Sequence, residues 1–191
     1  MNCKGCDLSV ALGFKEPDEG EARDRSQMRI REYVGKGMEE ISKHIIYPTK
    51  LFPINKELGQ FIINHSFQPY VKGHLVIQPI RCHNPSDQIC DIDKSTIASL
   101  FDLTRKVSKA LNESLKPERV YIWSFNEQHT NSPNWHLHIH IAPRNPSCKY
   151  RGPEWLFQKD KCSERVGLEE IERIVSGIRK ELQWQLDECC C

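Results

Sequence analysis

The chain has 191 residues and a formal net charge of +1, and 38% of its residues are hydrophobic. This length suits one domain with its own core, and the balanced charge excludes a general nucleic-acid-binding surface. No apolar run reaches membrane-spanning length, and 9 cysteines without a secretory leader argue against a disulfide framework. These features predict a cytoplasmic protein without a transmembrane segment.

Residues 1–50 are predicted to form an N-terminal arm. The arm opens with a short-spaced cysteine pair, Cys3 and Cys6, and apolar residues then recur at roughly helical spacing over 21–46. This pattern predicts one helix. We expect the helix to pack against the edge of a sheet or a partner subunit, or else to cover a site as a lid.

A domain over 51–187 follows, in which strand and helix signals alternate. Apolar runs bounded by Pro, Asn or Gly predict strands at 60–64, 73–78, 119–125 and 135–142. Strands grouped around a single crossover helix indicate an α+β fold, with an antiparallel sheet of about five strands rather than a parallel sheet.

Two amphipathic helices are predicted in this domain. The crossover helix is capped by Asp93 or Ser95 and stopped by Pro117. Its predicted buried stripe comprises Ile97, Leu100, Phe101, Val107, Leu111 and Leu115. The last helix is marked by Leu168, Ile171, Ile174, Val175, Ile178 and Leu182. Residues 188–191 form a cysteine-rich tail, which is expected to be exposed and oxidisable or else lipidated.

The most informative pattern is the alternation of histidines with aliphatic residues in the last predicted strand. Successive side chains of a strand point to opposite faces, so His136, His138 and His140 share one face. Such a row suits two kinds of chemistry. The imidazoles can bind a metal ion from one side, or a neutral imidazole can attack phosphorus while flanking donors hold the phosphate oxygens.

Two segments resemble the histidine triad family of nucleotide hydrolases and transferases. Residues 136–144 resemble the family's signature, and residues 69–79, where Gly73 and His74 open an apolar run ending at proline, resemble its other marked strand. The resemblance covers roughly 51–144. It implies cleavage of a phosphoanhydride or phosphoramidate at the α-phosphate of a nucleotide through a covalent nucleotidyl-histidine, with dinucleoside polyphosphates or adenylated small molecules as substrates. It also implies a homodimer.

The resemblance assigns His138 as the nucleophile. Its two like neighbours, His136 and His140, disfavour a charged central imidazole and so keep it neutral and able to attack. By resemblance, His140 contacts the scissile phosphate and His74 supports the triad from the neighbouring strand. Either of these, when protonated, would stabilise charge on the phosphoryl oxygens and the leaving group. A core role for His74 is the alternative.

The residues proposed to bind the nucleotide are Asn126, Ser132, Ser66, Asn64 and Arg144. Ser66 stands where the family usually has an Asn or Asp that holds the ribose, and Asn64 shares its face only if the strand is regular. Arg144 either pairs with phosphate or caps the strand end. Pro133 departs from the family pattern, because it replaces a residue that offers a hydroxyl and an N–H to the leaving group.

The resemblance also suggests a structural zinc ion. Cys3 and Cys6 have zinc-knuckle spacing, and the predicted tetrahedral set adds His136 and either Cys82 or His83. Covalent chemistry at His138 would need no cofactor.

Two other functions stay open on the sequence alone. The three strand histidines could hold a catalytic metal ion, which would make the protein a metal-dependent enzyme. Alternatively, the changes at Pro133 and Ser66 would suit a nucleotide-binding module without turnover.

Overall fold

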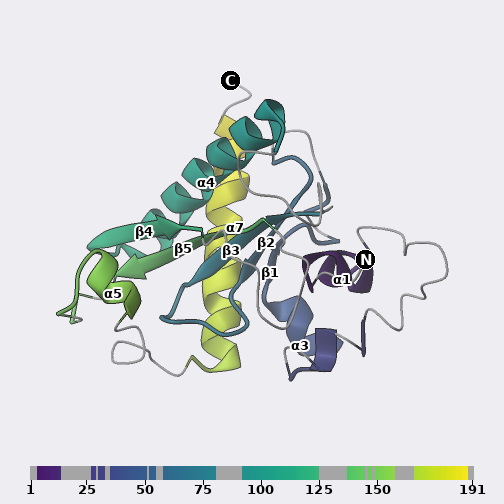
Figure 1. Cartoon of the computed structure of the whole chain (residues 1–191), viewed down its shortest axis with the longest axis horizontal. Helices are drawn as coiled ribbons and strands as arrows, with labels where there is room; N and C mark the ends of the chain where they lie inside the picture. Colours follow the sequence, from purple (N-terminus) through teal and green to yellow (C-terminus); the bar gives the residue numbers. More distant parts are fainter. Residues whose placement is uncertain are drawn as a thin grey trace.

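The computed structural model describes residues 4–13, 27–28, 30–32, 35–50, 52–54, 58–80, 92–124, 137–144, 146–147, 149–157 and 166–188. Within these ranges one antiparallel sheet has the strand order β1-β2-β3-β5-β4 (Figure 1). Its strands are β1 (Ile45–Tyr47), β2 (Phe61–His65), β3 (Leu75–Pro79), β4 (Arg119–Trp123) and β5 (Ile139–Arg144). The helices are α1 (Lys4–Ala11), α3 (Met38–Lys43), α4 (Lys94–Leu115), α5 (Pro153–Phe157) and α7 (Leu168–Glu188). The predicted α+β fold with about five antiparallel strands is confirmed.

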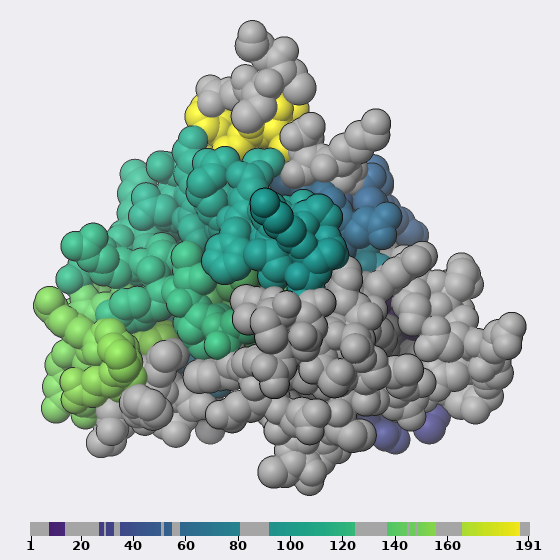
Figure 2. Space-filling model, turned by 45° about the horizontal axis from the view of Figure 1, so that its top comes forward, coloured from purple at the N-terminus to yellow at the C-terminus, as the bar shows by residue number. Residues whose placement is uncertain are grey.

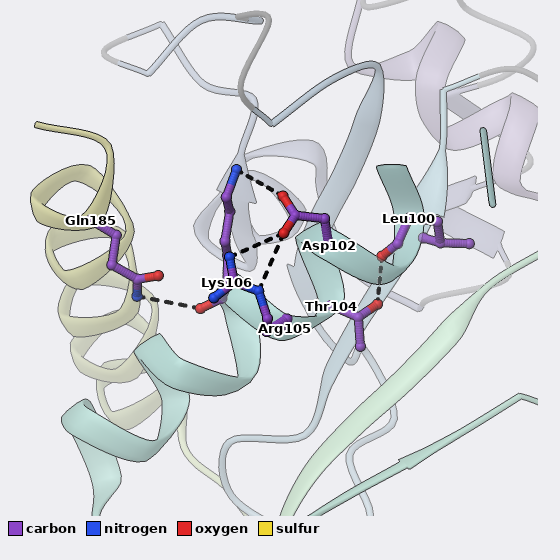
Figure 3. Close-up of polar contacts among 6 residues, drawn as sticks. All are labelled: Leu100, Asp102, Thr104, Arg105, Lys106 and Gln185. Atoms are coloured by element: carbon purple, nitrogen blue, oxygen red, sulfur yellow. Dashed lines mark hydrogen bonds and ion pairs between the residues drawn. The ribbon is translucent and has the colours of Figure 1, made fainter. Parts of the chain in front are cut away.

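One face of the sheet is covered by α4 and α7, which lie side by side (Figure 1). The Asp93 side chain caps α4 by accepting the Thr96 N–H at 2.9 Å, so the first of the two predicted caps is the one used. Gln185 on α7 donates to the carbonyl of Lys106 on α4 at 3.3 Å (Figure 3). In the space-filling view α4 forms part of the molecular surface, with the end of α7 above it and α5 beside it (Figure 2).

The main core lies between these two helices and the sheet. Alternate residues of the strands point into it because side chains of a strand alternate between faces. Burying this many aliphatic side chains is the main stabilising term of the fold. The core includes Leu75, Ile77, Ile139, Ile141, Leu100, Val107, Leu111, Ile174 and Ile178.

The opposite face carries two separate apolar clusters, one on each flank. The first cluster packs α1, α3 and Ile30 onto β1 and β2, with Leu8, Ile41, Ile62 and Ile80 among its buried members. The second packs α5 onto β4 and β5, with buried members Val71, Ala142 and Trp155. The middle of this face, on β3 and β5, lies between the two clusters.

The predicted helix over 21–46 is wrong as a single element. Residues 27–28 and 30–32 are helical where described, but a turn follows at 35–37 and α3 has only six residues. Gly35 has a φ of 69°, a conformation that glycine adopts readily and that interrupts a helix. Residues 45–47 then form β1, an edge strand that is buried at every position. The segment therefore contributes a strand to the sheet instead of covering it as one helix.

The predicted stripe of α4 needs one correction. Leu100, Val107 and Leu111 are buried as predicted, but Phe101 is 51% exposed. The buried line runs through Leu100, Leu103, Thr104, Val107, Ala110 and Leu111. Phe101 follows Leu100 by one residue, about 100° around the helix, and so points away from the core.

Among the helices that the structure describes, none is long and apolar enough to cross a membrane. The sheet begins at β1, before residue 51, which the sequence took as the start of the main domain. The last helix, α7, extends to Glu188.

Candidate functional site

The site is centred on His138 and His140, at the start of β5. In the register between β3 and β5 Val76 lies opposite His140, and on the other side of β5 Trp123 lies opposite the same histidine. His138 and His140 are half-buried, and the structure places both on the face between the two apolar clusters. The Ser124 hydroxyl donates to the carbonyl of His138 at 2.7 Å, which ties the start of β5 to the end of β4.

His74 lies behind His140, as the resemblance predicted. It precedes β3, is 1% exposed, and its Nε2 lies 3.0 Å from Nδ1 of His140. The backbone N–H of Tyr70 donates to His74 Nδ1 at 3.3 Å. With Nδ1 accepting, the single ring proton of a neutral His74 is on Nε2, and this proton is donated to His140.

The same hydrogen bonds indicate which ring nitrogen of a neutral His140 carries its proton. Its Nδ1 accepts from His74, so its own ring proton is on Nε2. For neutral imidazoles, these bonds form a directed chain from the Tyr70 N–H through His74 to His140. In the neutral form of this arrangement, each Nδ1 accepts a hydrogen bond and the ring proton of each imidazole is on Nε2.

Aromatic rings hold this pair of imidazoles in place. Trp123 stacks on His140 with ring centroids 5.0 Å apart and planes 14° apart, and on His74 at 5.4 Å. Tyr70 stacks on His74 at 4.9 Å. The His138 ring stands edge-on to His140, with centroids 4.7 Å apart. Stacking of this kind restricts rotation of the imidazole rings. The rings of Trp123 and Tyr70 therefore hold His74 and His140 in place, and His138 lies next to His140.

A second buried histidine supports the turn that presents His74. His65, at the end of β2, accepts the Gly73 N–H at its Nε2 at 3.2 Å, while its Nδ1 lies 3.0 Å from the Ser66 carbonyl. The Ser66 N–H in turn donates to the His74 carbonyl at 2.7 Å. Burial lowers the pKa of His65 to about 4, so this imidazole is neutral at neutral pH.

The candidate nucleotide-binding residues that the structure describes occupy different places. Asn64 is on the face of the site, since it pairs with Val76 in a regular β2, and its amide donates to the His65 carbonyl at 2.9 Å. Ser66 lies just beyond β2, and its hydroxyl accepts the Gln68 N–H at 3.3 Å. Both side chains therefore have local structural bonds.

Arg144 is not brought together with the histidines. It is four residues beyond His140 on β5, about 13 Å along an extended strand. Its guanidinium forms an ion pair with Glu118 and donates to the Tyr150 carbonyl at 3.4 Å. These bonds correspond to the strand-end role that was the alternative to phosphate binding.

Several predicted site residues lie outside the described part of the chain. Cys6 belongs to α1, but its side chain is outside the description. Among the residues that the structure does describe, no group of three or more His, Cys, Asp or Glu side chains could hold a metal ion. The predictions that lie outside the described residues are His136, Asn126, Ser132, Cys3, Cys82 and His83.

The aromatic part of the site was not predicted from the sequence. Trp123 was in a predicted strand and Tyr70 in the segment that carries the resemblance, but neither was singled out. Alternation within a strand identifies which residues share a face, whereas only the register between strands shows that Trp123 lies opposite His140. A tryptophan near the end of the strand preceding the histidine row was the available signal.

Comparison with known proteins agrees with this geometry. The HIT domain model matches residues 39–147. A Hit-like protein involved in cell-cycle regulation from Bartonella henselae has a similar structure, with a TM-score of 0.53 and 19% identity, over 84% of this chain and 99% of that chain. A hypothetical histidine triad nucleotide-binding protein from Sulfolobus tokodaii has a TM-score of 0.50 and 17% identity, over 73% of this chain and 83% of that chain. No curated protein sequence matches this chain significantly.

Proposed function

This chain belongs to the HIT (histidine triad) family, and from that premise we propose that it is an enzyme that cleaves a nucleotide at its α-phosphate. The observation that carries the proposal is the ordered set of His74, His140 and His138. Because the chain of hydrogen bonds places the proton of a neutral His140 on Nε2, the imidazole that adjoins His138 carries an N–H donor. A neutral nucleophile beside such a donor suits displacement at phosphorus.

The reaction has two steps in this proposal. In the first, a ring nitrogen of His138 bonds to the α-phosphorus while the bond to the bridging oxygen or nitrogen breaks, and the leaving group takes up a proton from solvent. In the second, water attacks the same phosphorus, the phosphorus–nitrogen bond breaks, and a nucleoside monophosphate leaves with His138 restored. The Nε2–H of His140 would stabilise the negative charge that develops on the phosphate oxygens.

Phosphoanhydrides and phosphoramidates attached to a nucleoside are the proposed substrate class. Dinucleoside polyphosphates and adenylated small molecules both present such a bond at the α-phosphate. The nucleophile is the same for either group, so the choice between them depends on residues around the row and not on the row itself.

A structural zinc ion at the edge of the site is part of the proposal. Leu8, two residues after Cys6, and Ile80, two residues before Cys82, belong to one buried cluster, which supports a set of ligands drawn from these two segments. Zinc there would fix the two segments to each other. His138 and His140 would remain for chemistry.

We also propose that two chains pair through β4. In the described sheet β4 is an edge strand, and Ile122 on it is 49% exposed. The opposite edge is less suited to pairing, because Arg179 of α7 donates to the carbonyls of Ile45 and Ile46 on β1. An exposed apolar edge strand is a favourable surface for strand addition.

The test is to trap the intermediate. The purified protein is mixed with a dinucleoside polyphosphate, quenched in base and analysed by mass spectrometry for a nucleotide linked to His138. His138→Ala should bind nucleotide but form no adduct and release no product. The matched variant His140→Ala keeps the nucleophile, so it should still form the adduct, about 100-fold more slowly.

The same preparation distinguishes the alternatives. Its metal content should be one zinc per chain, and adduct formation should need no added metal. Retained turnover in His138→Ala would exclude the nucleophile assignment. Activity that is lost on chelation and restored by a metal ion, without any adduct, would instead favour a metal-dependent enzyme.

A further inference from the structure

Gln78, on β3, is a buried polar residue whose side-chain amide N–H has no hydrogen-bond partner among the described contacts. It is 8% exposed, and its amide Nε2 is buried without a hydrogen-bond partner in the part of the chain that the structure describes. A buried amide N–H without a partner costs free energy because the hydrogen bonds it made to water are not replaced. A buried polar group of this kind calls for an explanation, and a ligand that binds during function is one.

The register of the sheet places Gln78 beside the nucleophile. Val76 lies opposite His140 and Ile77 opposite Ile139, where the paired residues of β3 and β5 end. Continued by one residue, the same antiparallel register would bring Gln78 opposite His138. Residues directly opposite each other project to the same face, with Cβ atoms about 5 Å apart. His138 therefore has the imidazole of His140 on its own strand and the amide of Gln78 on the neighbouring strand.

On the side away from β5, Gln78 borders an apolar cluster. There it pairs with Ile62, which is fully buried in the cluster that packs α1 and α3 onto the sheet. Gln78 is thus the polar residue at the border between this apolar cluster and the histidines. A phosphate oxygen at His138 would accept an amide N–H at this border, in a place shielded from water where such a bond is strong.

We propose that Gln78 contacts the substrate, donating its Nε2–H to an oxygen of the phosphate group that His138 attacks. This inference rests on the proposed function, since it assumes a phosphate at His138. Gln78 and His140 would then hold the phosphate from two neighbouring strands. The two donors would act together on the charge that develops during displacement.

The experiment compares two buried glutamines. Gln78→Leu removes an amide whose Nε2 has no partner, so it should leave the melting temperature unchanged or raise it, while it lowers kcat/KM for a dinucleoside polyphosphate about 100-fold. Gln185→Leu removes an amide that is 9% exposed but bonded to the Lys106 carbonyl (Figure 3). It should lower the melting temperature and leave kcat/KM unchanged.

Binding of AMP, measured by calorimetry, makes the test independent of turnover. Gln78→Leu should weaken AMP binding about 10-fold relative to the wild type, whereas Gln185→Leu should not. A Gln78→Leu protein with wild-type affinity and kcat/KM would overturn the inference, and so would a wild-type protein that does not bind AMP. A wild type that binds AMP through Gln78 but has no turnover would refute the proposed function and leave the contact intact.

Discussion

The imidazole of His65 connects the buried sheet to the histidines of the site. Its Nε2 accepts the N–H of Gly73, the residue immediately before His74. Protonation at this nitrogen would remove the acceptor, and burial already disfavours the charged ring. The state of one buried side chain thus determines how firmly the turn that carries His74 is held.

This coupling predicts a loss of stability in mild acid. The pKa of His65 is lowered to about 4 in the folded protein, while an unfolded histidine has a pKa of about 6.5, so the unfolded state takes up a proton first as pH falls. The stabilisation that comes from a neutral His65 is complete above about pH 6.5. About 3 kcal/mol of the free energy of unfolding should be lost between pH 6.5 and pH 4. Urea denaturation from pH 7 to 5 measures the slope.

His65→Gln is the comparison for this prediction. Glutamine offers a carbonyl that can accept the Gly73 N–H but cannot take up a proton in this range. The variant should therefore lose less stability between pH 7 and 5 than the wild type. An equal slope in both proteins would show that His65 does not titrate on unfolding. Part of the slope should remain, because burial also lowers the pKa of His44.

At this scale the sequence predicted the histidines but not their partners. Alternation placed His138 and His140 on one face, and the resemblance to a known strand placed His74 beside them. The stacking of Trp123 and the position of Gln78 depend on register between strands that are far apart in the sequence. A pattern within one strand carries no information about that register.

The turn between β2 and β3 requires glycine at one position. Gly73 has a φ of 82°, and a Cβ built there would lie 2.5 Å from the Leu115 side chain of α4. Gly73→Ala combines backbone strain with overpacking, so it should reduce the free energy of unfolding by about 3 kcal/mol. Because the Gly73 N–H bonds to His65, the site should lose its arrangement in the same variant.

Gly177→Ala is the matched control on α7. Its Cβ would lie 3.5 Å from the Ser114 hydroxyl, an ordinary contact, and alanine is the better helix former. The free energy of unfolding of this variant should rise by up to about 1 kcal/mol. Thermal or urea unfolding of both variants measures the two changes. If Gly73→Ala and Gly177→Ala changed the free energy of unfolding equally, the tight packing under the β2–β3 turn would not be the cause of the destabilisation.

At the scale of elements, long helices with a clear apolar stripe were predicted well. The crossover helix and the last helix correspond to α4 and α7, because many residues of each repeat one pattern. The single helix predicted over 21–46 was wrong, because apolar residues of the short helix α3 and of the strand β1 recur at nearly helical spacing. The β1 residues Ile45, Ile46 and Tyr47 are buried at every position, so alternation could not reveal a strand.

For the whole molecule, the proposed pairing through β4 predicts a dimer in solution. One chain has a mass of 22.3 kDa, so light scattering on the wild type should give about twice this value. Ile122→Lys places a charge on the exposed edge and should give a monomer with little change in the melting temperature. Ile54→Lys, at an isoleucine that is 42% exposed, is the control and should remain dimeric.

The sequence predicted the architecture of the whole molecule but not its boundaries. The two marked segments were sufficient to indicate the fold, since they contribute β3 and β5 at the centre of the sheet. The contribution of residues before 51 was not predicted, because β1 is short and joins the sheet through long-range pairing with β2. Contacts of that kind leave no periodic signal.

The two apolar clusters that flank the histidine row draw residues from beyond the family match at 39–147. Leu8 and Ile30 belong to one, and Trp155 to the other. The family match thus contains the histidine row, whereas residues on both sides of that match pack beside the row. Under the proposed function, substitutions in these flanking clusters would change which ligands fit beside the row while the histidines stay in place.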